Sequence, residues 1–219
     1  MKTFARCLIK TTVMRWILGL ALALLAGLIS IYTVTDGFTV VTAEAARRRD
    51  VERDPPVLLG ARVVNEADNE VSLRHALHGD GRVAIVNFFY TRCVSLCLAQ
   101  GYVTQRLQTA IAAQGLQDDI RLISISFDQR DRAVELNRYA STMRAQPEIW
   151  EFWALQIPGQ RDALLRQFGI TVVPAPYGDY EHNAALHVVT PDGRLAGIFD
   201  IEQPGLAFGL ATVLSSAGQ

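Results

Sequence analysis

The chain has 219 residues, with 21 lysines and arginines against 22 aspartates and glutamates, so its formal net charge is −1. This balance argues against a nucleic-acid-binding protein that relies on a basic surface. With 50% hydrophobic and 20% charged residues, the chain is too apolar to be disordered. The only lysines are Lys2 and Lys10, which excludes a Walker A or Schiff-base lysine later in the chain. Three cysteines, Cys7, Cys93 and Cys97, are too few for a disulfide-rich mini-protein.

The N-terminal segment has the composition of a membrane anchor. Residues 1–15 form a basic cytoplasmic segment without acidic residues, and residues 16–35 contain no charge. Twenty helical residues span about 30 Å, which is the thickness of a hydrocarbon core. Positive charge before the span predicts a single-pass protein of the inner or plasma membrane whose remainder is extracytoplasmic, in the periplasm. Two alternatives stay open: a buried core helix, and a signal peptide cleaved at the Ala-Glu-Ala sequence of residues 43–45.

The remainder predicts a linker over residues 36–55 and one α/β domain over residues 56–219. Apolar runs of buried-strand type and amphipathic segments alternate along this domain. The expected elements are a strand over 83–90, a helix over 95–113, a strand over 120–127, helices over 131–143 and 159–168, a hairpin of 184–190 and 194–200, and a closing helix over 204–216. This order predicts a thioredoxin-like fold, a central mixed sheet flanked by helices, behind an N-terminal transmembrane helix.

The cysteine pair Cys93 and Cys97 lies where thiol chemistry is expected. Both residues follow the first buried strand directly, at the turn into a helix and in its first turn. A spacing of four puts both sulfurs on one helical face, and a helix N-terminus favours the thiolate. Such a pair suits disulfide exchange or a soft metal ion in an oxidising compartment. A plain structural disulfide and two buried small hydrophobic residues are the alternatives.

The four histidines can be separated by their positions. His75 and His78 lie in a polar stretch and are expected on the surface. His182 and His187 are five residues apart, so in an extended chain they point to opposite faces and cannot both address one site. The loop position of His182 and its polar neighbours favour it as the functional residue. Two thiolates and one imidazole would form a low-coordinate set suited to Cu(I), unless the cysteine pair and the histidine are unrelated polar features.

Three motifs together resemble the Sco/SenC family over nearly the whole chain. A phenylalanine-rich strand leads through Tyr90-Thr91 to the C-x3-C pair, and an Ile-Ser-x-Asp strand end follows at Asp128. His182 lies nine residues before the Pro-Asp-Gly turn of residues 191–193. The resemblance implies a membrane-anchored, copper-binding thioredoxin-like protein whose metal ligands are Cys93, Cys97 and His182. It also implies delivery of copper to the CuA site of cytochrome c oxidase or a related cuproprotein, or reduction of that site's thiols.

The resemblance leaves some roles open. It implies that Asp128 is a residue behind the ligands or one that faces a partner. Family members usually have proline after each cysteine and in the Asp-Pro-x-Arg-Asp stretch, where this chain has Val94, Leu98 and Gln129. These differences leave room for an alternative, a membrane-tethered thiol–disulfide oxidoreductase in which Cys93 attacks and Cys97 resolves. A redox sensor on the same two thiols is a further alternative.

Overall fold

The computed structural model describes residues 2–35, 42–93 and 96–217, and the chain divides into two units, Met1–Arg49 and Asp50–Gln219. In the first unit, α1 (Lys2–Val34) contains an apolar stretch, Met14–Val34, that is long and apolar enough to cross a membrane. This helix covers the segment expected as an anchor. Of the expected linker, residues 36–41 lie outside the described residues, and most of the remainder forms the helix α2 (Ala43–Arg53).

The second unit is built on a seven-stranded mixed sheet with the strand order β2-β1-β5-β4-β3-β8-β9. The three central strands are parallel, and the strands on either side of them run antiparallel to their neighbours. The strands are β1 (Arg62–Asn65), β2 (Glu70–Ser72), β3 (Val83–Phe89), β4 (Ile120–Ser126), β5 (Trp150–Ala154), β8 (Ala185–Val189) and β9 (Leu195–Asp200). The expected mixed sheet is therefore confirmed, and β1, β2 and β5 are additions to the expected elements.

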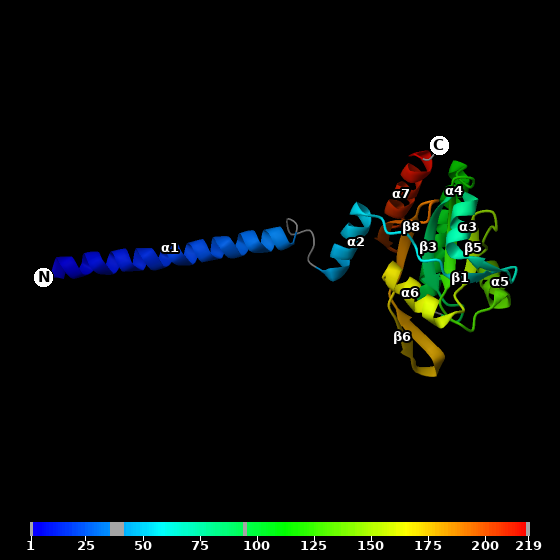
Figure 1. Ribbon diagram of the computed structural model, residues 1–219, viewed down its shortest axis with the longest axis horizontal. Helices are drawn as coiled ribbons and strands as arrows, with labels where there is room; N and C mark the ends of the chain where they lie inside the picture. The colour runs from blue at the N-terminus through cyan, green and yellow to red at the C-terminus, as the bar shows by residue number, and fades with distance from the viewer. Residues whose placement is uncertain (1, 36–41, 94–95, 218–219) are drawn as a thin grey trace. The chain divides into compact units, whose positions relative to one another are not determined.

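Helices cover both faces of this sheet, as Figure 1 shows. They are α3 (Leu73–Asp80), α4 (Leu96–Gln114), α5 (Ala133–Thr142), α6 (Pro158–Phe168) and α7 (Pro204–Ala217). Adjacent residues of β3 show the two layers: Phe88 packs edge-on against Phe168 of α6, whereas Phe89 packs against Tyr139 of α5. A strand that is covered on both faces reads as a continuous apolar run, which is why every residue of β3 is buried.

A small second sheet lies beside α6, away from the main sheet (Figure 1). It is the antiparallel hairpin of β6 (Val172–Ala175) and β7 (Asp179–His182). The 3-10 turn η1 (Pro176–Gly178) joins the strands, and Tyr177 at its centre is fully exposed with a φ of 62°. This hairpin is not predicted from the sequence, because Pro174 and Pro176 disfavour a strand, although an edge strand tolerates proline.

Candidate metal centre

The loop that leads to Cys93 is fixed to the end of β4 by a buried carboxylate. Asp131 accepts hydrogen bonds from the Thr91 amide (2.9 Å), the Thr91 hydroxyl (2.6 Å) and the Ser126 hydroxyl (2.5 Å). The strands β3 and β4 are parallel, so their carboxyl ends lie at one edge of the sheet, where binding sites of such folds occur. The carboxylate therefore holds Thr91, two residues before Cys93, at that edge.

The two thiols and one imidazole lie together at this edge. Cys93 is 6% exposed and Cys97, in the first turn of α4, is 1% exposed. The Cys97 amide donates to the Cys93 sulfur at 3.3 Å, and the Cys97 sulfur lies 3.4 Å from Nε2 of His182. The three ligand atoms all lie within 4.8 Å of one another. In the part of the chain that the structure describes, this is the only group of three or more histidine, cysteine, aspartate or glutamate side chains placed to hold a metal ion.

His182 reaches the thiols from the last position of β7. Its Nδ1 lies 2.9 Å from the carbonyl oxygen of Asn183. Because a carbonyl only accepts hydrogen bonds, Nδ1 carries the proton, and Nε2 keeps a lone pair that points to the sulfur. The rings of Phe127 and Tyr90 stand edge-on to the imidazole, with centroids 5.0 and 6.0 Å away. These two rings fix the orientation of the His182 imidazole and exclude water from one side of the three ligand candidates.

Two pKa shifts describe the protons of the group. The hydrogen bond with Cys93 and then burial raise the pKa of the Cys97 thiol far above its usual range. This is the opposite of the effect that we expected from the helix N-terminus, because burial next to a second sulfur outweighs the backbone dipole. Burial and the hydrogen bond to Asp179 raise the pKa of Tyr90, so Tyr90 remains a phenol that donates to this carboxylate.

Asp128 forms ion pairs with two arginines close to the three ligand candidates. Its side chain is 1% exposed, and it pairs with Arg92 and, at 2.9 Å, with Nη2 of Arg130. Burial and the nearby Asp131 raise the pKa of Asp128, while Arg92 opposes this rise. A carboxylate this deeply buried does not itself face a partner. It holds the guanidinium groups, which are about half exposed, at the rim of the site.

The other histidines lie apart from the thiols. His75 and His78 are exposed on α3, as expected for surface residues. His187 is fully buried in β8, where its ring nitrogens lie 3.2 Å from the Val86 carbonyl oxygen and 2.9 Å from that of Phe168. It is therefore a core residue bonded to the backbone. The side chain of Cys7 lies outside the described side chains.

Several residues that surround the three ligand candidates are not predicted from the sequence. Tyr180 packs edge-on against both Tyr90 and Phe127, and Asp131 fixes the cysteine loop. No spacing rule joins Asp131 to Thr91, forty residues away. The signal that was present is the polar pair Asp128 and Asp131 directly after a buried strand.

The comparisons with known proteins decide the family. The family model described as SCO1/SenC matches residues 62–208, about two thirds of the chain. The chain belongs to the SCO1/SenC family. No curated protein sequence matches it.

Solved structures of the same family share the fold. A SCO1/SenC family lipoprotein from Bacillus anthracis is 16% identical, with a TM-score of 0.66 over 74% of this chain and 98% of that one. BsSco, described as a Sco family member with a disulfide switch, is 22% identical, with a TM-score of 0.62 over 74% and 96%. Bradyrhizobium japonicum ScoI, solved with copper bound, is 20% identical, with a TM-score of 0.59 over 73% and 99%. At these identities the structures establish the thioredoxin-like fold of this SCO1/SenC protein.

Proposed function

We propose that this SCO1/SenC protein binds Cu(I) through the sulfurs of Cys93 and Cys97 and through Nε2 of His182. The observation that carries the proposal is the convergence of these three atoms within 4.8 Å. Three ligands at about 2.3 Å from one ion lie about 4 Å apart, so little movement is needed to close the site. Two thiolates with one imidazole form a soft, low-coordinate set, which favours Cu(I). The structure of Bradyrhizobium japonicum ScoI with copper bound supports the proposal that this chain binds copper.

The residues around the ligands support reversible binding. Metal binding displaces the proton that the raised pKa of Cys97 retains, so binding is coupled to proton release. The Asn183 carbonyl keeps His182 in the tautomer that coordinates through Nε2. Cys93 also lines a cavity of about 410 Å³ together with Thr91, Arg92 and Tyr139, which gives a partner's ligands a route to the sulfur.

The proposed recipient is a cuproprotein such as the CuA-bearing subunit of cytochrome c oxidase. The similar protein BsSco is a member of the Sco family of cytochrome c oxidase assembly proteins, and this supports the proposal. The transfer would exchange the three ligands here for those of the recipient, one at a time. Mixing the copper-loaded chain with a copper-free CuA subunit, then measuring copper in each protein after separation, tests this step.

The proposed topology places the domain outside the cytoplasm. The apolar stretch Met14–Val34 and the basic residues before it support a single inner-membrane span with a periplasmic domain over residues 56–219. Protease digestion of spheroplasts should remove the domain and leave the N-terminal segment. Protection of the domain in intact spheroplasts would contradict this topology.

Copper analysis of the full chain, purified in a neutral detergent under reductant, tests the ligand set. We expect one copper per chain in the wild type, and loss of most of this copper in Cys93→Ala and His182→Ala. His75→Ala, which replaces an exposed histidine on α3, is the matched control and should retain the wild-type stoichiometry. Unchanged Cu(I) binding by His182→Ala would contradict the proposal.

A second function, thiol–disulfide exchange, is favoured by the cavity at Cys93. In this reaction the Cys93 thiolate attacks a partner disulfide, and Cys97 then attacks the mixed disulfide. The partner leaves with two thiols, and the chain keeps one disulfide. Reaction of the reduced chain with a disulfide peptide, in the presence of a Cu(I) chelator, tests it. An unreactive Cys93 at neutral pH would exclude this activity.

A further inference from the structure

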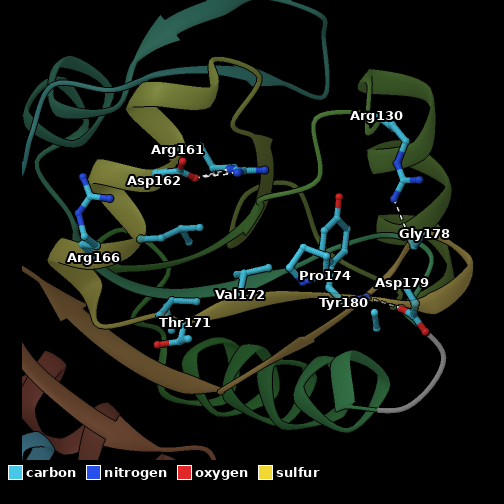
Figure 2. A pocket seen from close by; sticks show the side chains of 13 residues that line it. Arg130, Arg161, Asp162, Arg166, Thr171, Val172, Pro174, Gly178, Asp179 and Tyr180 are labelled. Atoms are coloured by element: carbon cyan, nitrogen blue, oxygen red, sulfur yellow. Dashed lines mark hydrogen bonds and ion pairs between the residues drawn. The ribbon is translucent and has the colours of Figure 1, made fainter.

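A cavity of about 580 Å³ lies between α6 and the hairpin of β6 and β7, and the last residue of β7 is the proposed copper ligand His182. Its apolar walls include Leu165, Ile170 and Val172. Figure 2 shows arginine side chains along α6 on one side and Arg130 near Gly178 at the other end. The volume is within the range of pockets that hold small ligands or a short peptide segment.

Three arginines line this cavity from two separate parts of the chain. Arg161 and Arg166 come from α6, and Arg130 comes from the loop after β4. Arg130 is held in place by Asp128 and by the carbonyl oxygen of Gly178, to which its Nη2 donates at 2.7 Å. Arg161 pairs at 2.7 Å with the exposed Asp162. Arg166 makes no side-chain hydrogen bond or ion pair within the part of the chain that the structure describes.

The carboxylates that line the cavity do not cancel this charge. Two aspartates line the cavity beside the three arginines: Asp162 pairs with its neighbour Arg161, and Asp179 keeps its negative charge while it accepts the hydrogen bond from Tyr90. One guanidinium is thus left in excess, in a domain whose residues from Ala46 onward carry more acidic side chains than arginines. The positive charge is therefore a local feature of the cavity, suited to a carboxylate ligand because guanidinium forks match carboxylate oxygens.

The same hairpin face forms a wall of the cavity and carries a proposed copper ligand. In the register of the hairpin, Val172 is opposite His182 and Pro174 is opposite Tyr180. The side chains of Val172, Pro174 and Tyr180 line the cavity, and His182 follows Tyr180 on the same face. Tyr180 also packs against Tyr90 and Phe127, which surround the imidazole. A ligand in the cavity would therefore contact Val172, which is the residue that pairs with His182 in the hairpin.

We propose that this cavity binds an acidic segment of the protein with which the chain exchanges copper. The inference rests on the proposed copper function, and it names how the partner is recognised. A peptide fits better than an inorganic anion, because the arginines alternate with apolar walls. The fully exposed ring of Tyr177 at the hairpin tip adds a side chain of the kind that anchors protein contacts.

Fluorescence anisotropy of the full chain in neutral detergent tests the proposal. The probe is a blocked five-residue peptide in which glutamate alternates with leucine, labelled with a neutral fluorophore, and its glutamine analogue is the control ligand. We expect saturable binding at low salt, weakened about tenfold or more by replacing glutamate with glutamine and by the double variant Arg161→Gln/Arg166→Gln. Arg106→Gln, which replaces an exposed arginine on α4, should bind the acidic peptide as the wild type does.

Two further measurements complete the test. Free glutarate separates the sources of the carboxylate: weak competition supports a peptide ligand, whereas competition as strong as that of the peptide itself overturns the peptide assignment. Equal binding of the acidic peptide by the double variant and the wild type overturns the site. Copper stoichiometry is measured in parallel and should be unchanged in the double variant. A wild-type chain that binds no copper but still binds the acidic peptide would instead contradict the proposed copper function, and the peptide site would stand.

Discussion

Asp131 gives the sharpest test of how the copper ligands are held. Its carboxylate accepts three hydrogen bonds, two from Thr91 and one from Ser126, at a site that is 1% exposed. Asp131→Ala removes all three and leaves the Thr91 amide without its acceptor. Asp131→Asn keeps the shape: its oxygen can replace Oδ2, and its NH2 group can donate to the Thr91 hydroxyl, which rotates to accept.

The magnitudes follow from these contacts. A hydrogen bond to a charged group contributes about 1.5–3 kcal/mol, and bonds that share one acceptor are not additive, so Asp131→Ala should cost about 3–5 kcal/mol. Asp131→Asn loses only the charge and should cost about 1–2 kcal/mol. With a urea m-value of about 2 kcal/mol per molar, the alanine variant unfolds about 1.5–2.5 M earlier than the wild type. Cu(I) affinity should fall in the same order, because Thr91 is two residues before Cys93.

Urea unfolding of the full chain in neutral detergent measures this effect. The fluorescence of Trp150 and Trp153, both buried in β5, reports the domain, and Trp16 in α1 contributes a background. Asp54→Ala, at an exposed aspartate, is the control and should leave the midpoint unchanged. An alanine variant as stable as the wild type, or an asparagine variant less stable than the alanine variant, would refute the reasoning.

Two other predictions concern groups outside the metal centre. His187→Leu removes a buried imidazole whose single N–H donates to one of two nearby carbonyl oxygens, and should cost about 1–3 kcal/mol in urea unfolding. Copper stoichiometry should be unchanged, and lost copper with full stability would contradict its role as a core residue. Burial, and then the nearby Glu151, raise the pKa of Glu66, so the folded chain holds this proton more tightly than the unfolded chain. The contribution of Glu66 to stability is therefore greatest below pH 4.5 and declines as pH rises. Glu66→Gln should gain stability relative to the wild type between about pH 4.5 and 7, and a parallel pH dependence of the two proteins would disprove this.

The sequence predicts the elements that have a strong period or a long apolar run. The strands β3 and β4, the helices α4 to α7 and the hairpin of β8 and β9 lie within two residues of their expected bounds. The edge strand β2 and its neighbour β1 are short and mostly polar, and β5 carries Glu151 between aromatic residues, so neither pattern separates a strand from a loop. Their positions depend on pairing partners that are distant in sequence, which a local pattern does not contain.

The ligand candidates were predictable from position, but their surroundings were not. Cys93 and Cys97 follow a buried strand, and polar neighbours favour His182 over His187, so local rules were sufficient to select three residues that the structure brings together. Their role as ligands stays a prediction. The expected loop position of His182 was wrong, because His182 ends β7 of the small sheet whereas His187 lies in β8 of the main sheet, so their alternation along one strand does not apply. The helix N-terminus predicted a lowered pKa for the Cys97 thiol, and this prediction was wrong. The pKa is raised, because it depends on the neighbouring Cys93 and on burial, which the sequence does not show. The cavity lined by Arg130, Arg161 and Arg166 likewise combines residues of the loop after β4, of α6 and of the β6–β7 hairpin, so no single motif contains it.

The hairpin of β6 and β7 has a consequence for the evolution of this protein. One short segment carries both the imidazole and a wall of the arginine cavity, with Tyr180 between them. A substitution that adapts the segment to a new partner also alters the position of the His182 side chain. A substitution that changes the position of His182 likewise alters the wall of the cavity. Selection for partner choice and selection for metal affinity are therefore coupled in this segment. Cys93 and Cys97 lie outside the hairpin, between β3 and the first turn of α4, and are not subject to this coupling.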